Sequence, residues 1–262
     1  MSKTRIIGCL AAKGGVGKTT SSINLSAALG FFGKNVIIVD GNLTTPNIGI
    51  YLGVPIAPIT LHDVLKGKNE IDEALYNHMG GVKIVPASIA LKDAKKIELG
   101  GLRGAISDLY GECDYVIVDG AAGLGKESIA TIKAVDEVLI IANPEMPSVT
   151  DALKTIKIAK ELKKKILGVV VTKTNIKNAD MPIRDIENIL ETPVIGIIPE
   201  DRAIKFSQAK KEAVVHTYPK SAASIQYKKL AADLIGEQYS ESIELQNSGL
   251  VYGILRFLGF KD

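Results

Sequence analysis

Seven short runs of apolar, mostly β-branched residues recur between Ile6 and Glu200. The runs are IIGCLA, NVIIVD, VKIVPA, YVIVDG, EVLIIANP, ILGVVVTK and PVIGIIPE, and the helix-like stretches that follow or separate them include TTSSINLSAALGFFG, SVTDALKTIKIAKELKKK and AASIQYKKLAADLIGE. Nearly continuous apolar runs are typical of strands buried on both faces, and strands that alternate with helices indicate βαβ units. The sequence therefore predicts an α/β fold with one mostly parallel sheet of about seven strands and helices on both faces.

The first apolar run leads into the glycine-rich segment AAKGGVGKTT, which precedes a helix-like stretch. Such a turn can direct successive backbone N–H groups inward, and the helix N-terminus adds partial positive charge. In this pattern Lys18 reaches terminal phosphate oxygens and the Thr19 hydroxyl binds Mg²⁺. The pattern predicts a P-loop NTPase fold. The predicted nucleotide-binding residues of the loop are Gly14, Gly15, Val16, Gly17, Lys18, Thr19 and Thr20.

Composition limits the classes of partner and compartment. The formal charge of +3 over 262 residues is too small to indicate a nucleic-acid partner by itself. Cys9 and Cys113 are far apart and form no CxxC pair, which favours a reducing compartment. No apolar run approaches the roughly 18 residues of a membrane-spanning helix, and the MSKTR start shows no secretory signal. We therefore expect a cytoplasmic globular protein, one that can still touch a surface.

The loop also departs from the general pattern, because Ala12 replaces the usual first glycine and Lys13 follows it. This KGGVGKT sequence resembles the deviant phosphate-loop ATPases related to MinD and ParA, and within that family the MinD-like, archaeal-type branch. GVKIVPAS, YVIVDGAAG, NPEMPSVTDA, IGIIPED and AASIQYKKLAADLIGE resemble family segments in family order, up to about residue 236. The resemblance implies an ATPase that uses ATP and Mg²⁺ and forms a homodimer in the ATP state, in which Lys13 reaches the partner's nucleotide.

The resemblance also implies roles for residues outside the loop. Asp40 and Asp119 end two apolar runs and are implied Mg²⁺ ligands beside Thr19, although carboxylates at strand ends are also common helix caps and turn formers. Gly123 resembles a glycine that senses the γ-phosphate. The implied base contacts are Pro199 and Glu200, and the implied catalytic residues are Lys13, Lys18, Asp40 and Asn42.

Two positions differ from the family pattern. Asn42 stands where the family usually has an aspartate that orients the attacking water. An amide cannot accept a proton, and general-base assistance raises reaction rates by about 10²- to 10⁴-fold, so we expect slow hydrolysis. The alternative is that Asn42 is a turn former beside Gly41 and Pro46. Thr172 replaces an adenine-reading asparagine, for which Asn175 is a candidate substitute.

The last residues form a separate unit in the predicted domain organisation, in which residues 1–236 are the ATPase domain and 237–248 a polar linker. Residues 249–262 are predicted to form an amphipathic helix, too short to span a bilayer and suited to its interface. The alternative is a helix that docks on its own domain. Its apolar arc is predicted to contain Leu250, Val251, Ile254, Leu255, Phe257 and Leu258.

These features leave three functional classes open. The first is a MinD-like positioning ATPase for septum-site determination, whose ATP-bound dimer binds the cytoplasmic face of a membrane. The second is a ParA-like segregation ATPase that binds DNA non-specifically, and the third is a nucleotide-binding switch with impaired hydrolysis. The sequence identifies neither the cargo nor the activating protein. A lysine-rich helix, usually a solvated face, could supply DNA phosphate contacts through Lys154, Lys157, Lys160, Lys163, Lys164 and Lys165.

Overall fold

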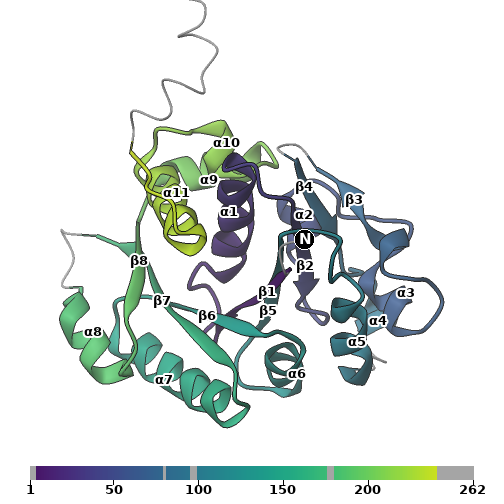
Figure 1. The fold of residues 1–262 in the computed structure, drawn as a ribbon, viewed down its shortest axis with the longest axis horizontal. Coiled ribbons are helices and arrows are strands. Elements are labelled where there is room, and N and C mark those ends of the chain that lie inside the picture. The colour runs from purple at the N-terminus through teal and green to yellow at the C-terminus, as the bar shows by residue number, and fades with distance from the viewer. Residues whose placement is uncertain (1–3, 79–80, 95–98, 176–179, 241–262) are drawn as a thin grey trace, which may run out of the picture.

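A single sheet organises the chain in the computed structural model, which describes residues 4–78, 81–94, 99–175 and 180–240. Its eight strands follow the order β3-β4-β2-β5-β1-β6-β7-β8 (Figure 1). Every pair of neighbours except β3 and β4 is parallel, so the predicted mostly parallel sheet is confirmed. The strands are β1 (Arg5–Ala11), β2 (Val36–Gly41), β3 (Tyr76–Asn77), β4 (Val82–Val85), β5 (Tyr115–Ala122), β6 (Glu137–Ala142), β7 (Lys165–Thr174) and β8 (Val194–Pro199).

The strand that the sequence did not predict is β3, at the sheet edge. It has two residues and pairs antiparallel with β4, with Tyr76 opposite Ile84. A strand of two residues is too short to show an alternating pattern. Only its tertiary position beside β4 identifies it.

Helices cover both faces of the sheet, as predicted. The α-helices are α1 (Lys18–Phe31), α2 (Ile48–Tyr51), α3 (Leu61–Leu65), α4 (Leu91–Ala94), α5 (Leu102–Ser107), α6 (Lys126–Ala134), α7 (Met146–Glu161), α8 (Ile183–Leu190), α9 (Arg202–Ala209), α10 (Val214–Thr217) and α11 (Ala222–Ile235), with short 3₁₀ turns at Asp72–Ala74 and Leu99–Gly101. In Figure 1, α1 and α9 to α11 lie on one side of the sheet and α5 to α8 on the other.

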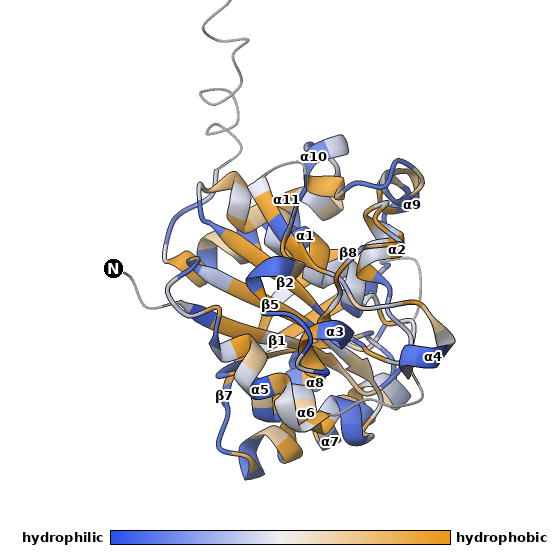
Figure 2. Ribbon diagram, turned by 90° about the vertical axis from the view of Figure 1, so that its right-hand side faces the viewer, coloured by the Kyte–Doolittle hydropathy of each residue, from blue (hydrophilic) through white to orange (hydrophobic). Residues whose placement is uncertain are grey.

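The core accordingly has two parts, one on each face of the sheet. One cluster joins strand residues such as Val118 to α5, α6 and α7, and the other joins strand residues such as Ile117 to α1 and α11. Consecutive strand residues belong to different clusters because side chains alternate across a sheet. The apolar strands therefore lie between two helical layers (Figure 2), which explains why their sequences are apolar throughout.

The strand order also determines where a ligand can bind. β1 lies between β5 and β6. After β1 the chain forms α1 and then β2, which lies on the β5 side of β1, and β6 to β8 later extend the sheet on the opposite side of β1. In open α/β sheets ligands bind outside the carboxyl ends of the strands where the order reverses. The AAKGGVGKTT loop follows β1 at this point.

The lysine-rich helix is shorter than predicted. α7 ends at Glu161, so Lys154, Lys157 and Lys160 are helical but the last three lysines are not. Lys163 adopts a left-handed backbone with φ 55°, Lys164 donates to the Val135 carbonyl at 2.6 Å, and Lys165 begins β7. The prediction that one helix carries all six lysines, mostly along one side, is therefore wrong.

The C-terminal part of the description ends soon after α11. Gly236 ends this helix with a left-handed backbone, φ 75°, and the Tyr239 ring packs edge-on against Phe32 with ring centroids 6.2 Å apart. The predicted amphipathic helix lies outside the described residues. Among the helices that are described, none combines the length and the apolar character needed to cross a membrane.

Candidate nucleotide-binding site

The loop between β1 and α1 has the backbone geometry of an anion cradle. Gly15 and Gly17 adopt left-handed conformations, with φ 77° and 91°, which glycine adopts without steric cost. α1 begins at Lys18, and its N-cap residue, Gly17, offers no side-chain hydrogen bond to the first N–H groups. Space is open around Gly14 and Gly15, since a Cβ built there meets nothing within 4 Å. Uncapped N–H groups beside open space are suited to an anion.

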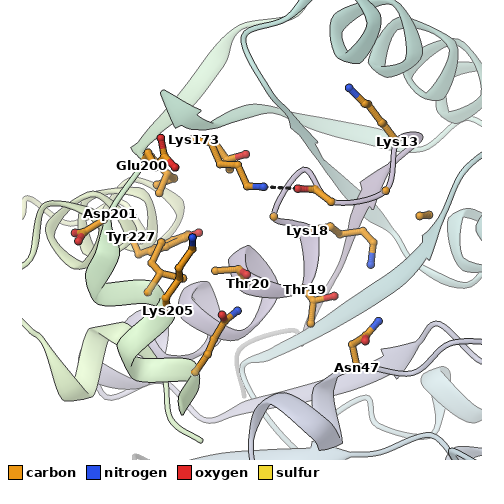
Figure 3. A pocket seen from close by; sticks show the side chains of 18 of the residues that line it. Lys13, Lys18, Thr19, Thr20, Asn47, Lys173, Glu200, Asp201, Lys205 and Tyr227 are labelled. Atoms are coloured by element: carbon orange, nitrogen blue, oxygen red, sulfur yellow. Dashed lines mark hydrogen bonds between the residues drawn. The ribbon is translucent and has the colours of Figure 1, made fainter. Parts of the chain in front are cut away.

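A cavity of about 580 Å³ lies against this loop. It joins the loop to β7, to the end of β8 and to α9, as Figure 3 shows. The predicted site residues that line the cavity are Lys13, Gly14, Gly15, Gly17, Lys18, Thr19, Thr20, Asn42, Pro199 and Glu200. Segments almost two hundred residues apart thus share one cavity, whose volume falls within the roughly 300–1,000 Å³ of small-molecule sites.

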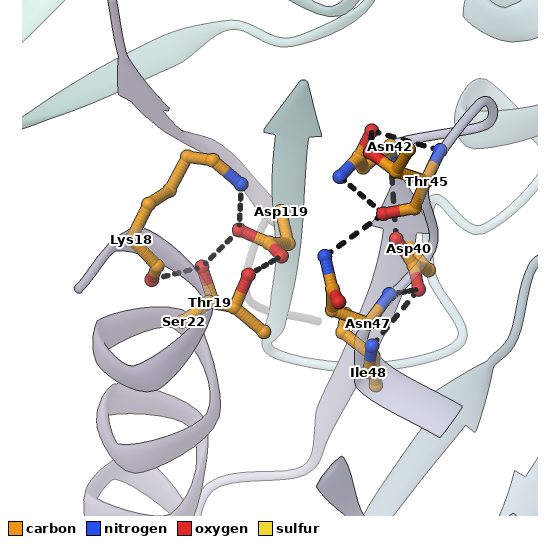
Figure 4. Close-up of polar contacts among 9 residues, drawn as sticks. All are labelled: Lys18, Thr19, Ser22, Asp40, Asn42, Thr45, Asn47, Ile48 and Asp119. Atoms are coloured by element: carbon orange, nitrogen blue, oxygen red, sulfur yellow. Dashed lines mark hydrogen bonds and ion pairs between the residues drawn. The ribbon is translucent and has the colours of Figure 1, made fainter. Parts of the chain in front are cut away.

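Beneath the loop, the Asp119 carboxylate is the centre of a buried polar cluster (Figure 4). Lys18 Nζ lies 2.7 Å from Asp119 Oδ1, and the Thr19 hydroxyl donates to Oδ2 at 2.6 Å. Ser22, one turn further along α1, donates to Oδ1 at 3.0 Å. Lys18 is 6% exposed and Asp119 fully buried. Removal of one partner from a buried ion pair of this kind strongly destabilises the folded protein, because the other charge is left buried and unpaired.

Asp40 lies beside Asp119 because β2 and β5 pair in register, with these two residues opposite each other. Its carboxylate accepts hydrogen bonds from the backbone N–H groups of Asn47 and Ile48, both at 3.0 Å, and of Asn42 at 3.2 Å. Asp40 therefore does hold the start of α2, which is the role of a helix cap. Burial and the charge of Asp119 raise the pKa of Asp40 to about 7, because both disfavour the ionised form.

Asn42 forms a closed turn with Thr45. Its Nδ2 donates to the Thr45 carbonyl at 2.5 Å, while its Oδ1 accepts from the Thr45 hydroxyl at 3.1 Å. Asn42 is 6% exposed. This geometry matches the turn-forming alternative, in which the side chain organises the loop before α2.

Lys13 points away from the loop to which it belongs, as Figure 3 shows. Its Nζ lies 3.3 Å from Glu145, the residue before α7, and the two side chains are 44% and 60% exposed. An exposed ion pair of this kind contributes little to stability. The Lys13 side chain is therefore held only weakly in this position.

Some predicted site residues lie outside the cavity wall. Val16 is 2% exposed and packs in the core, and Gly123, with φ 90°, donates its N–H to the Ala11 carbonyl at 3.1 Å. Asn175 lines an adjoining hollow, which shares Pro199 and Glu200 with the main cavity. The candidate substitute for the adenine-reading asparagine thus lies beside the cavity and not in its wall.

The structure also adds residues that the sequence did not nominate. Ser22 completes the Asp119 cluster, and Lys205 and Tyr227 line the cavity from α9 and α11. Asp201 caps α9 through Ala203 N–H at 2.8 Å and also accepts from Ala223 N–H at 3.0 Å. These residues carry no local pattern, with the exception of Asp201, whose place before a helical stretch is a cap signal.

The fold and loop together define a class: an α/β protein of the phosphate-loop type, with a ligand cavity at the carboxyl ends of its strands. The family described as an AAA domain matches residues 4–171. An uncharacterized ATP-binding protein of Methanocaldococcus jannaschii is 34% identical over 252 residues, which is 96% of this chain and 96% of that protein.

Solved structures agree with the sequence comparison. The cell division ATPase MinD of Pyrococcus furiosus superposes with a TM-score of 0.86 at 33% identity, over 88% of this chain and 98% of that one. The septum site-determining protein MinD of Pyrococcus horikoshii, complexed with Mg-ADP, gives 0.85 at 31% identity, over 94% and 99%. The chain belongs to the MinD/ParA family of ATPases.

Proposed function

We propose that this protein is a MinD-like positioning ATPase, which dimerises with ATP and Mg²⁺ and then binds a membrane surface through residues 249–262. Hydrolysis of ATP would separate the dimer and release it from the membrane. The observation that carries the proposal is the buried cluster of Lys18, Thr19 and Asp119 under an open cavity lined by the phosphate loop.

The cavity suits a nucleotide in both shape and charge. Loop N–H groups and Lys18 offer hydrogen bonds and positive charge to phosphates, and the far wall at Ile198, Pro199 and Tyr227 offers apolar surface to a base. The Pyrococcus horikoshii relative was solved with Mg-ADP. ATP is therefore the proposed ligand, with its terminal phosphate near Lys18 and its base toward β8.

The residues beneath the loop fit a magnesium ion. Thr19, Asp40 and Asp119 supply the hard oxygen atoms that Mg²⁺ prefers, and Mg²⁺ takes its other ligands from phosphates and water. Burial, and then the charge of Asp119, raise the pKa of Asp40, and a cation beside the two carboxylates would favour their ionised forms. The ion would neutralise phosphate charge, and the chain would orient it through Thr19, Asp40 and Asp119.

Lys13 supports the proposed dimer. Its side chain points out of its own cavity, and among the described residues the exposed Glu145 is its ion-pair partner. Exchange of this weak ion pair for the phosphates of a second subunit's nucleotide would be favourable, because the new pair would be less exposed to solvent. ATP would thus be the ligand that joins the two copies.

Hydrolysis is proposed to be slow. The Asn42 amide has no proton-accepting carboxylate and is already engaged with Thr45. Without a residue that accepts the proton of water, the reaction lacks assistance worth about 10²- to 10⁴-fold. An activating protein would then determine how long the dimer persists.

The proposed membrane contact depends on avidity. One short apolar helix binds a bilayer weakly, since ordering its residues offsets much of the gain from burial. Two such helices on one dimer act at high effective concentration, and binding can rise by about 10² or more. Because Arg256 and Lys261 are the basic residues of this segment, the dependence on anionic lipid should be mild.

Liposome flotation tests the proposal. The full-length protein is expected to float with vesicles in Mg-ATP and not in Mg-ADP, and deletion from Gly249 onward should abolish flotation while ATP binding persists. Equal flotation of the deleted protein, or none of the full-length protein in ATP, would refute membrane attachment by the tail. Salt-sensitive retention on DNA without flotation would instead indicate the segregation class. Absence of phosphate release in a single turnover would indicate the switch class.

A further inference from the structure

Lys173 occupies an unusual position at the end of β7. The pairing of β7 with β8 shifts there, since Thr172 lies opposite Ile198 while Thr174 lies opposite Pro199. Lys173 is therefore the extra residue of a bulge, and its backbone is left-handed with φ 57°. This conformation is unfavourable for a residue with a Cβ. Bulges beside functional sites commonly redirect a side chain.

The bulge directs the lysine to the phosphate loop. Lys173 Nζ donates to the Gly15 carbonyl at 2.6 Å, which Figure 3 shows as the dashed line across the cavity. The preceding residue binds the next carbonyl, as the Thr172 hydroxyl donates to Val16 at 2.5 Å. Two consecutive residues of β7 thus bind two consecutive carbonyls of the loop.

These contacts constrain the direction of the loop N–H groups. In a planar trans peptide the C=O group and the following N–H group point in opposite directions. With the Gly15 and Val16 carbonyls held toward β7, the N–H groups of Val16 and Gly17 are directed away from it. Backbone N–H groups arranged in this way make a concave anion site.

We propose that Lys173, together with Thr172, is a positioning residue that clamps the phosphate loop in its anion-binding conformation. This inference rests on the proposed nucleotide-binding function. The proposal also gives Thr172 a role other than base recognition, because its hydroxyl binds the Val16 carbonyl of the loop. An asparagine side chain is larger than threonine at this position. Lys173 lines the cavity and its ammonium lies against the phosphate loop, so the clamp would also add positive charge beside bound phosphates.

The test compares three variants by calorimetric titration with Mg-ATP. Lys173→Met, which keeps the aliphatic stem, is expected to lose about tenfold or more in affinity, as is typical for a charged hydrogen bond. Lys173→Arg should restore most of it. Lys163→Met is the matched control, since Lys163 is also an exposed lysine with a left-handed backbone, φ 55°, and it should bind like wild type.

A second measurement needs no nucleotide. The amide ¹H–¹⁵N resonances of Val16 and Gly17 should move in Lys173→Met and not in Lys163→Met, because the peptide planes lose their restraint. Wild-type affinity with unmoved resonances in Lys173→Met would overturn the clamp, as would an arginine variant as weak as the methionine one. If wild-type protein failed to bind Mg-ATP, the proposed function would fail, and the resonances of the nucleotide-free protein would still decide the clamp.

Discussion

The cavity has a phosphate half, formed by the loop between β1 and α1, and a base half, formed by the end of β8 and α9. The two halves differ in how exposed their charged side chains are. In and beneath the phosphate half, Lys18, Asp40 and Asp119 are at most 6% exposed and engage one another or nearby backbone N–H groups. In the base half, Glu200 and Lys205 are exposed, and neither is among the side chains that bind the phosphate loop. A buried charge loses much when its partner is removed, whereas an exposed one is compensated by water. The phosphate half should therefore tolerate few substitutions and the base half many.

Lys18→Ala should have the largest effect and sharpen this contrast. It removes the cation nearest the expected phosphates and leaves Asp119 without its ion pair. Affinity for Mg-ATP should fall by about a hundredfold or more, since charged hydrogen bonds contribute roughly 1.5–3 kcal/mol each. Calorimetric titration measures this, with circular dichroism to confirm folding. Lys205→Ala is the comparison from the base half, and a loss as large as that of Lys18→Ala would break the contrast.

Lys13→Ala separates binding from dimerisation. Because Lys13 points away from its own cavity and contacts Glu145, the monomer should bind ATP within about twofold of wild type, as is usual for an exposed ion pair. The ATP-dependent dimer should be absent in analytical ultracentrifugation. An equal loss of ATP affinity in Lys13→Ala and Lys18→Ala would contradict the different roles given to the two lysines.

Asp40→Asn tests the proposed metal ligand. Affinity for ADP should fall by about tenfold or more in Mg²⁺, in line with the effect of altered metal-site residues. In EDTA the variant should bind ADP at least as tightly as wild type, since the Asp40 charge then has no ion to hold and only repels the phosphates. A loss of the same size in EDTA would show that Asp40 acts only as the cap of α2 through Asn47 and Ile48.

Asn42→Asp tests what limits ATP hydrolysis in the phosphate half. A carboxylate there is the group that slow hydrolysis lacks, but it cannot donate to the Thr45 carbonyl, now 2.5 Å from Asn42 Nδ2. We expect faster phosphate release, because the carboxylate supplies the missing proton acceptor, and a loss of about 1 kcal/mol in the free energy of unfolding. Unchanged release would mean that the side chain at this position does not reach the attacking water.

Glu200→Ala should have the smallest effect. The backbone N–H of Glu200 donates to the Thr174 carbonyl at 2.9 Å, and its side chain is exposed at the base half. If only its backbone faces the base, ATP affinity should stay within about twofold, as for most exposed positions. A tenfold loss would show that the side chain reads the base, and the base half would then be less tolerant than the contrast predicts.

The strands and the phosphate loop can be predicted from local sequence. Apolar runs buried on both faces identify all the strands except β3, and the glycines and Lys18 of KGGVGKT carry a local backbone pattern. These are local properties, because alternation, glycine conformations and helix starts depend on neighbouring residues. The resemblance added Asp40 and Asp119, whose proximity follows from the pairing of β2 with β5.

The contacts between distant segments could not be predicted in this way. The Lys173 contact with Gly15 spans 158 residues, and it depends on a bulge that no local pattern in ILGVVVTK announces. The fold likewise sets the outward direction of Lys13, the turn that Asn42 closes with Thr45, and the contact of Lys164 with the Val135 carbonyl. Such contacts depend on the packed positions of whole elements, because side-chain direction follows from burial and partners that sequence spacing does not contain.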